Sequence, residues 1–485
     1  MERVFANYLV LFAALISASS SATVQSTPKP NIVFVLADDY GYNDIGYHGD
    51  QIKTPVLDRL AASGVKLENY YVQPICTPTR SQLLSGRYQI HTGLQHSIIV
   101  NSQANALPLD SPTIADKLKE SGYATHMAGK WHVGFYKEEF MPQNRGFDTY
   151  YGYLGGHDTY YTHTNNFTTK AYLDWRDETG PVFNESGLYS AQLLTNRAIQ
   201  VVRGHNPDKH PLFLYLAYQS VHNPLQVPER YEKQYKHIKD ENRRLYAGMV
   251  AALDEGVGNL TAALKETGLW DNTVFILSTD NGGTVLYGGN NYPLRGWKGR
   301  DARRGLRGRR SGGPTVSSGC GRLAGGSLNG TKDLDGFDQW DTIIKGNKSP
   351  RKVMLHNIDI LYTPSGQPLE KYVHIWDTSV RAALRMGDYK IITGDPRNGS
   401  WVPPPDGRHY DLPEIKDDPD KNLWLFNIKG DPYEHHDLSK KEPEVVEVML
   451  RMLKAMNETA VPPHFPPRDP QSNPALHGGV WGPWQ

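Results

Sequence analysis

Apolar runs alternate with amphipathic segments along the first two thirds of the chain. Three runs are rich in β-branched or aromatic residues and stop at polar residues, which indicates buried strands: 32–37, the run from 211 that ends near His222, and the run from 273 that ends at Asp280 and Asn281. Segments with helical spacing of apolar residues lie between them, at 54–64, 113–122 and 244–268. Strands that alternate with helices predict an α/β fold, in which helices sandwich a large, mostly parallel sheet.

The pattern changes near residue 345. The stretches "SVRAALRMGDYKIITG" and "LWLFNIKGDPYEHHDLS" are typical of short strands and turns, and "EPEVVEVMLRMLKAMNET" of an amphipathic helix. We therefore expect a large N-terminal domain over 23–345. A smaller C-terminal α+β domain over 346–485 would contain an antiparallel sheet and a helix. Its Pro-rich tail, from residue 462, is expected to run extended over the surface.

The first 22 residues have the pattern of a secretory signal peptide. An apolar run from Tyr8 to Ile16 ends in small residues before Thr23, and it is shorter than the roughly 20 residues of a membrane-spanning helix. This pattern predicts a product of the secretory pathway. No later stretch is apolar enough to span a bilayer. Seven Asn-x-Ser/Thr sequons are candidate glycosylation sites. They are Asn166, Asn184, Asn259, Asn329, Asn347, Asn398 and Asn457.

Charge and one anomalous stretch refine this picture. The chain has 52 basic and 52 acidic residues, which gives no sign of a nucleic-acid partner. Residues 299–322, "GRDARRGLRGRRSGGPTVSSGCGR", consist mostly of Arg, Gly and Ser. One interpretation is a basic, disordered loop that binds polyanions. The one we favour is a frameshifted or mis-spliced translation, because long structureless loops are uncommon inside compact domains.

Polar residues at predicted strand ends are candidate metal ligands. Asp38 and Asp39 follow the first strand, and Asp280 and Asn281 follow the run at 273–279. A single Asp at a strand end is commonly a cap or turn residue. Because ligands bind beyond the carboxyl ends of parallel strands, two such pairs favour a Ca²⁺ or Mg²⁺ site that substrate oxygens complete.

Basic residues near the same strand ends favour an anionic ligand. Lys130 and His132 are two residues apart and share one side if the segment is extended, and His222 lies where another strand should end. Each alone is more commonly a surface or packed residue. Together with Lys298 and a divalent ion, they would form a cationic pocket in which a histidine transfers protons.

Cys76 is one of two cysteines, and the other, Cys320, lies in the anomalous stretch. The two would pair in an oxidising compartment if the fold brought them together, which the sequence does not determine. A buried free cysteine is the simplest alternative. The neighbours of Cys76 are not typical of a core, and Pro78 is typical of a first helical turn. We therefore expect a reactive cysteine at a helix N-terminus near Arg80, with a depressed pKa, facing an anion site.

The stretch "CTPTRSQLLSGR" resembles the signature C-x-P-x-R of sulfatases, formylglycine-dependent members of the alkaline-phosphatase-like superfamily. In that family the cysteine is oxidised to formylglycine (3-oxoalanine). The resemblance extends over nearly the whole mature chain, including "NIVFVLADDYGYNDIGYHG", "GKWHVG", "RGFDTYYGY", "LFLYLAYQSVHNPLQVP" and "FILSTDNGG". Within the family it is strongest to the arylsulfatase B group, the N-acetylgalactosamine-4-sulfatases, and to arylsulfatases I and J.

The resemblance implies a glycosaminoglycan-degrading sulfuric ester hydrolase, lysosomal or extracellular. It removes sulfate from sulfated sugars, in particular N-acetylgalactosamine 4-sulfate of chondroitin and dermatan sulfate. The partners implied are this sulfated carbohydrate and the formylglycine-generating enzyme, which acts on Cys76 during maturation. The implied ligands of one Ca²⁺ ion are Asp38, Asp39, Asp280, Asn281 and the formylglycine made from Cys76.

The resemblance also implies the roles of the remaining site residues. Arg80 and Lys130 steady the formylglycine hydrate, whose oxygen attacks sulfur. Lys130, Lys298 and His222 contact the sulfate, and His222 donates a proton to the leaving oxygen. His132 then helps to deprotonate the second hydroxyl, which expels sulfate and restores the aldehyde.

The sequence departs from the family pattern in two places. Thr79 replaces the usual Ser, but it keeps a hydroxyl. After Lys298, a Glu-Gly-Gly-x-Arg segment, a strand and a helix of the family give way to the anomalous stretch, so part of the core sheet is expected to be missing. One alternative is therefore a catalytically impaired, secreted homologue that binds sulfated glycans. A phosphohydrolase that uses Ser, Thr or unmodified Cys is a further alternative, which the C-x-P-x-R context disfavours.

Overall fold

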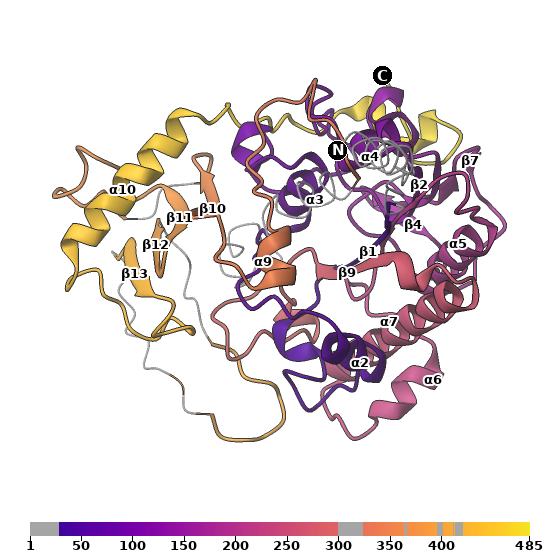
Figure 1. The fold of residues 1–485 in the computed structure, drawn as a ribbon, viewed down its shortest axis with the longest axis horizontal. Coiled ribbons are helices and arrows are strands. Elements are labelled where there is room, and N and C mark those ends of the chain that lie inside the picture. Colours follow the sequence, from indigo (N-terminus) through magenta and orange to yellow (C-terminus); the bar gives the residue numbers. More distant parts are fainter. Residues whose placement is uncertain (1–28, 299–323, 363–365, 395–400, 411, 413–420) are drawn as a thin grey trace, which may run out of the picture.

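The chain folds into a large α/β part and a smaller C-terminal part that lie side by side in a computed structural model (Figure 1). The structure describes residues 29–298, 324–362, 366–394, 401–410, 412 and 421–485. The expected signal peptide, the anomalous stretch with Cys320, and the sequon at Asn398 lie outside the described residues.

A seven-stranded sheet forms the centre of the large part, with the order β7-β6-β3-β2-β8-β1-β9. The five strands from β3 to β9 in this order run parallel, and β6 and β7 are antiparallel at one edge. The strands are β1 (Asn31–Ala37), β2 (Ala124–Lys130), β3 (Thr149–Tyr153), β6 (Arg176–Asp177), β7 (Gly180–Pro181), β8 (Leu212–Ala217) and β9 (Thr273–Thr279). The mostly parallel sheet predicted from the sequence is confirmed.

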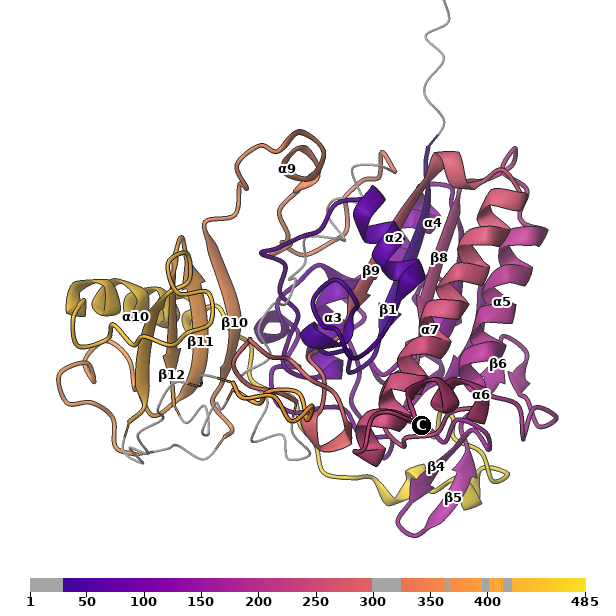
Figure 2. The same ribbon diagram turned by 90° about the horizontal axis from the view of Figure 1, so that it is seen from below.

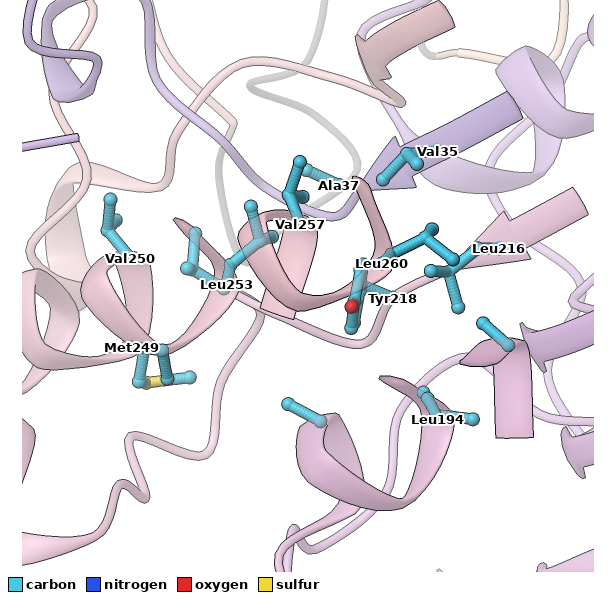
Figure 3. Packing of buried hydrophobic residues seen from close by; sticks show 14 of the residues in the cluster. Val35, Ala37, Leu194, Leu216, Tyr218, Met249, Val250, Leu253, Val257 and Leu260 are labelled. Atoms are coloured by element: carbon cyan, nitrogen blue, oxygen red, sulfur yellow. The ribbon is translucent and has the colours of Figure 1, made fainter. Parts of the chain in front are cut away.

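Helices cover both faces of this sheet. One face carries α2 (Pro55–Ser63), α5 (Ser190–Gly204), α6 (Glu229–Glu232) and α7 (Glu241–Glu266), and the other carries α3 (Cys76–Ser85) and α4 (Ile114–Glu120). Successive side chains of a strand point to opposite faces. Val33 and Val35 of β1 therefore pack with the α5 and α7 side, and Phe34 packs with the α3 and α4 side. Figure 3 shows side chains of the first of these two layers, among them Leu253 and Val257 of α7 and Val35 and Ala37 of β1.

Local sequence signals set several helix ends. Pro55 opens α2 after Thr54, and Gly64 follows its last residue. Thr113 and Asp116 form a reciprocal capping box at α4. The Asp240 side chain accepts a hydrogen bond from the backbone N–H of Arg243, and this cap sets the start of α7 at Glu241. The helix then continues unbroken to Glu266.

The smaller part contains an antiparallel sheet and a helix, as predicted. The sheet order is β10-β11-β12-β13, and α10 packs on it through Val446, Met449, Leu450 and Leu453. The elements are β10 (Val353–Asp359), β11 (Arg381–Met386), β12 (Tyr389–Thr393), β13 (Leu423–Asn427) and α10 (Pro443–Glu458); α9 (Trp340–Lys345) precedes them. The division at residue 345 stays a prediction.

The C-terminal tail returns to the large part, where it ends near the hairpin β4 (Thr164–Phe167) and β5 (Lys170–Leu173) (Figure 2). Trp481 is only 3% exposed; its backbone N–H donates to Leu173 O at 2.8 Å and its indole N–H to Asn165 O at 3.1 Å. The tail thus follows the surface, as expected, but it also contributes a tryptophan to the core.

The edge strand β9 borders an apolar groove of about 560 Å³, which α2 and α9 also line. Among the described residues β9 pairs only with β1, and Leu277 is 38% exposed there. This edge strand precedes, along the chain, the point after Lys298 at which the sequence departs from the family pattern. No helix in the described part of the chain has the length and apolarity required to cross a membrane.

Candidate active site

The candidate active site lies where β1, β8 and β9 end. The Asp38 N–H donates to Ser220 O at 2.9 Å beyond β8, and the Asp280 N–H donates to Ala37 O at 2.9 Å beyond β9. Asp38, Asp39, Asp280 and Asn281 are all buried, with at most 2% exposure. Asp39 has a φ of 57°, which an L-residue rarely adopts and which is typical of functional sites. The structure thus brings together the four strand-end residues that the sequence predicted as a group.

Cys76 begins α3 and points toward these carboxylates. Its Sγ lies 3.8 Å from Asp38 Oδ1 and 3.0 Å from Lys298 Nζ. Among the described residues Cys76 forms no disulfide. Burial raises the pKa of its thiol to about 12, although Lys130 and Lys298 act in the opposite direction. The expectation of a depressed pKa was wrong, because the sequence does not reveal that the helix N-terminus is buried.

Arg80 lies one turn further along α3 and is fully buried. Its Nε and Nη2 donate to Asp280 Oδ2 at 3.1 and 2.9 Å, and its Nη2 lies 3.4 Å from Asp38 Oδ2. Burial opposes the charge of Arg80, but these two carboxylates outweigh it and raise the pKa of the guanidinium. Arg80 therefore fixes two of the predicted metal ligands.

Two lysines complete a set of buried ion pairs. Lys130 at the end of β2 has its Nζ 2.5 Å from Asp38 Oδ2, and Lys298 has its Nζ 2.5 Å from Asp39 Oδ1. Burial tends to lower the pKa of Lys298, but the Asp39 carboxylate outweighs it and raises that pKa well above its usual value. Lys298 is therefore held charged beside Cys76, and Lys130 is paired with Asp38.

His132 lies two residues after Lys130, with a φ of 55° and 2% exposure. Its Nε2 is 3.0 Å from the carbonyl of Ile99, which can only accept, so Nε2 carries the proton. In the neutral ring Nδ1 then carries no proton, and it has no hydrogen-bond partner among the described residues. Burial, followed by the charges of Lys130 and Arg80, lowers the pKa of His132 well below its usual value. The imidazole is therefore neutral, with a lone pair available at Nδ1.

His222 faces the site from the loop after β8. Its Nδ1 lies 2.6 Å from the carbonyl of Asn223, and its Nε2 lies 3.7 Å from Asp39 Oδ2. Burial lowers the pKa of His222 below 6.5, and the Asp39 carboxylate opposes this shift. Asp38, Asp39, Cys76 and His222 each offer one donor atom within 4.8 Å of the others.

The donor set fits a hard divalent cation. Carboxylate and amide oxygens are the donors that Ca²⁺ prefers. The Asn281 amide donates from Nδ2 to Asp39 Oδ1 at 2.5 Å, whereas its buried Oδ1 has no hydrogen-bond partner among the described residues. A buried oxygen of this kind is costly unless a donor or cation satisfies it. The residues present therefore fit the metal that the sequence predicted.

Three threonines support the site, and their contacts were not predicted from the sequence, although Thr79 stood out there as a departure from the family pattern. The Thr284 hydroxyl donates to Asp39 Oδ2 at 3.0 Å, and the Thr77 hydroxyl donates to His132 O at 3.2 Å. The Thr79 hydroxyl donates to Asp280 O at 2.6 Å and accepts from Gln73 N at 2.9 Å, so this departure from the family pattern retains a hydroxyl that the site uses. Proximity to Cys76 and Asp280 in the sequence was the only available signal for these threonines.

The sulfatase family model matches residues 30–307. The chain is 47% identical to arylsulfatase J of Mus musculus over 503 aligned positions, which cover 97% of this chain and 83% of that protein. The chain therefore belongs to the sulfatase family and is a sulfuric ester hydrolase.

More distant similarities agree with this family. Arylsulfatase A of Homo sapiens is 28% identical over 89% of each chain. N-acetylgalactosamine-6-sulfatase of Mus musculus is 25% identical over 92% of this chain and 88% of its own. The crystal structure of Ps i-CgsB in complex with k-i-k-neocarrahexaose superposes with a TM-score of 0.73 and 29% identity, covering 90% of this chain and 94% of that chain. The resemblance noted in the sequence is confirmed.

Proposed function

We propose that the enzyme removes sulfate from sulfated sugars, with N-acetylgalactosamine 4-sulfate of chondroitin and dermatan sulfate as its substrate. The observation that carries this proposal is the position of Cys76 between Lys298 and Asp38, inside a group of buried ion pairs. Buried lysines beside a nucleophile position suit an anionic ester group. The name of the relative N-acetylgalactosamine-6-sulfatase and the k-i-k-neocarrahexaose in complex with Ps i-CgsB support a sugar substrate.

Cys76 is, in this proposal, the precursor of formylglycine, made by the formylglycine-generating enzyme in the secretory pathway. The Sγ atom stands where the oxygens of the hydrated aldehyde would lie. A thiol with a pKa of about 12 stays protonated at neutral pH and is a poor nucleophile, which supports the modification. The hydrated aldehyde supplies the oxygen that attacks sulfur.

Ca²⁺ is the proposed metal, held by Asp38, Asp39, Asp280 and Asn281 with modified Cys76. When bound, the ion supplies positive charge that stabilises negative charge on the sulfuryl oxygens. Arg80 contributes by fixing the carboxylates of Asp38 and Asp280.

The remaining residues bind the sulfate group and move protons. Lys130 and Lys298 hold the sulfate oxygens, and Lys130 also steadies the formylglycine hydrate with Arg80. His222 donates a proton from Nε2 to the leaving sugar oxygen, and His132 accepts a proton at Nδ1 when the aldehyde is restored. We place the enzyme in the lysosome or the extracellular space, with glycans at the predicted sequons. Asn166, Asn184, Asn259, Asn329 and Asn347 are exposed, and Asn457 is partly exposed.

Sulfate release from a sulfated disaccharide and from an aryl sulfate tests this proposal. We expect the wild type to hydrolyse both substrates and Cys76→Ala to hydrolyse neither. The free energy of unfolding of Cys76→Ala, followed by thermal unfolding, should remain within about 1 kcal/mol of the wild-type value. Treatment with a chelator should abolish turnover, and Ca²⁺ should restore it. Turnover retained by Cys76→Ala would overturn the assignment.

A further inference from the structure

The segment from Gly155 to Asp158 joins the two histidines of the site. A Cβ atom built on Gly156 would lie 2.8 Å from Nε2 of His132, so the backbone passes directly against that imidazole. The ring of the next residue, His157, stacks on His222, with the ring centroids 5.8 Å apart and the planes inclined by 17°. One short segment thus contacts both residues to which we assign proton transfer.

This segment is held firmly at both ends. The backbone N–H groups of Leu154 and Gly155 each donate to the buried carboxylate of Asp174 at 2.9 Å. On the other side, the Tyr160 hydroxyl donates to His222 O at 2.8 Å, and the Gln219 amide donates to Asp158 O. The loop that carries His157 is therefore tied to the loop that carries His222, which fixes the stacked pair.

His157 differs from the other site residues because it is exposed, whereas Lys130 and the carboxylates are buried. It is nevertheless within electrostatic reach of the site. Partial desolvation of the ring, followed by the charges of His222, Lys130 and Lys298, lowers the pKa of His157 to about 4. A group at this position lies between the buried anion pocket and solvent.

A sulfate ester has one anionic end, and the rest of the substrate extends outward from it. The buried lysines suit the sulfate, and the leaving oxygen would lie at His222. The alcohol attached to that oxygen therefore passes the exposed neighbour of His222. We propose that His157 is a substrate-contacting residue that binds the sugar carrying the scissile sulfate. Its imidazole offers a flat face for the sugar ring and nitrogens that pair with hydroxyl groups.

This inference rests on the proposed function, but a binding experiment separates the two. In a Cys76→Ala background, which removes turnover, the dissociation constants of inorganic sulfate and of a sulfated disaccharide are measured by calorimetry, with and without His157→Ala. We expect His157→Ala to raise the dissociation constant of the disaccharide about 5- to 10-fold, because one hydrogen bond and its contact area are lost. The dissociation constant of sulfate should change by less than about twofold. His374→Ala, an exposed histidine of the smaller part, is the matched control and should leave both constants unchanged.

Equal weakening of sulfate and disaccharide would overturn the inference, because His157 would then act only by shaping the anion pocket. Unchanged disaccharide binding, or no disaccharide binding by Cys76→Ala itself, would also overturn it. His157→Phe and His157→Gln show which feature acts, since Phe retains the flat face and Gln retains polar atoms. Absence of hydrolysis by the wild type would contradict the proposed function and leave this binding result standing by itself.

Discussion

Two nitrogens of Arg80, Nε at 3.1 Å and Nη2 at 2.9 Å, donate hydrogen bonds to a single carboxylate oxygen of Asp280, and both residues are fully buried. One residue lies on α3 and the other just after β9, so this pair ties the helix that carries Cys76 to the strand ends that carry the proposed metal ligands. The positions of the proposed metal ligands and of Cys76 therefore depend on one buried cation.

Replacing Arg80 with alanine should destabilise the protein strongly. The carboxylate of Asp280 would remain buried without its cation, which costs about 3–5 kcal/mol. Chemical denaturation followed by circular dichroism measures this loss. Arg87→Ala, in the turn just after the same helix, is the control and should cost less than about 1 kcal/mol because Arg87 is partly exposed. Equal losses for the two variants would refute the role given to Arg80.

The hydroxyl of Thr79 can be tested by two substitutions, one that removes the hydroxyl and one that keeps it. Thr79→Val removes the bond to Asp280 O and leaves the buried Gln73 N–H without its acceptor, at a cost of about 1–3 kcal/mol. Thr79→Ser keeps the hydroxyl and should retain more of the stability. The free energy of unfolding of the two variants checks this, and a valine variant as stable as wild type would show that the hydroxyl contributes nothing.

The activity should depend on pH through His222. A proton donor acts in its protonated form, so its contribution is present below its pKa and is lost as pH rises through it. Burial puts the pKa of His222 below 6.5, and we therefore expect kcat/KM to fall toward neutral pH. His222→Gln should lower kcat by about 10²–10⁴-fold and remove this limb of the profile. A wild-type profile that stays flat to pH 8 would speak against His222 as the donor.

The C-terminal tail should contribute to the stability of the large part. Trp481 packs in the same core layer as α3 and α4, so Trp481→Ala should cost about 3–5 kcal/mol. Leu476→Ala, at a position of the same tail that is 61% exposed, should change stability by less than about 0.5 kcal/mol. Thermal unfolding of both variants provides the comparison, and a Trp481→Ala protein that unfolds like wild type would mean that the tail is dispensable.

The features that could be predicted from the sequence are those that depend on the order of residues along the chain. Asp38 and Asp280 each follow a buried run, and the carboxyl ends of parallel strands must meet at one edge, so their proximity followed from the pattern. The burial of individual side chains could not be predicted in the same way. The thiol of Cys76 has a raised pKa because tertiary packing encloses α3, and a single sequence contains no signal for that enclosure.

Contacts between loops that are distant along the chain could not be predicted from the sequence either. His157 is a lone histidine in a loop, and its stacking on His222 depends on how the loops after β3 and β8 meet. Trp481 belongs to a Pro-rich segment whose composition indicates an extended chain but not the core that receives its indole. Such residues are located by three-dimensional packing, which periodicity does not encode.

Mass spectrometry shows whether Cys76 is the precursor of the proposed nucleophile. The protein is secreted from a eukaryotic cell and digested with trypsin, and the peptide from Leu67 to Arg80 is analysed. We expect formylglycine in place of Cys76 in this peptide. An intact thiol at this position, in protein that hydrolyses a sulfate ester, would contradict it.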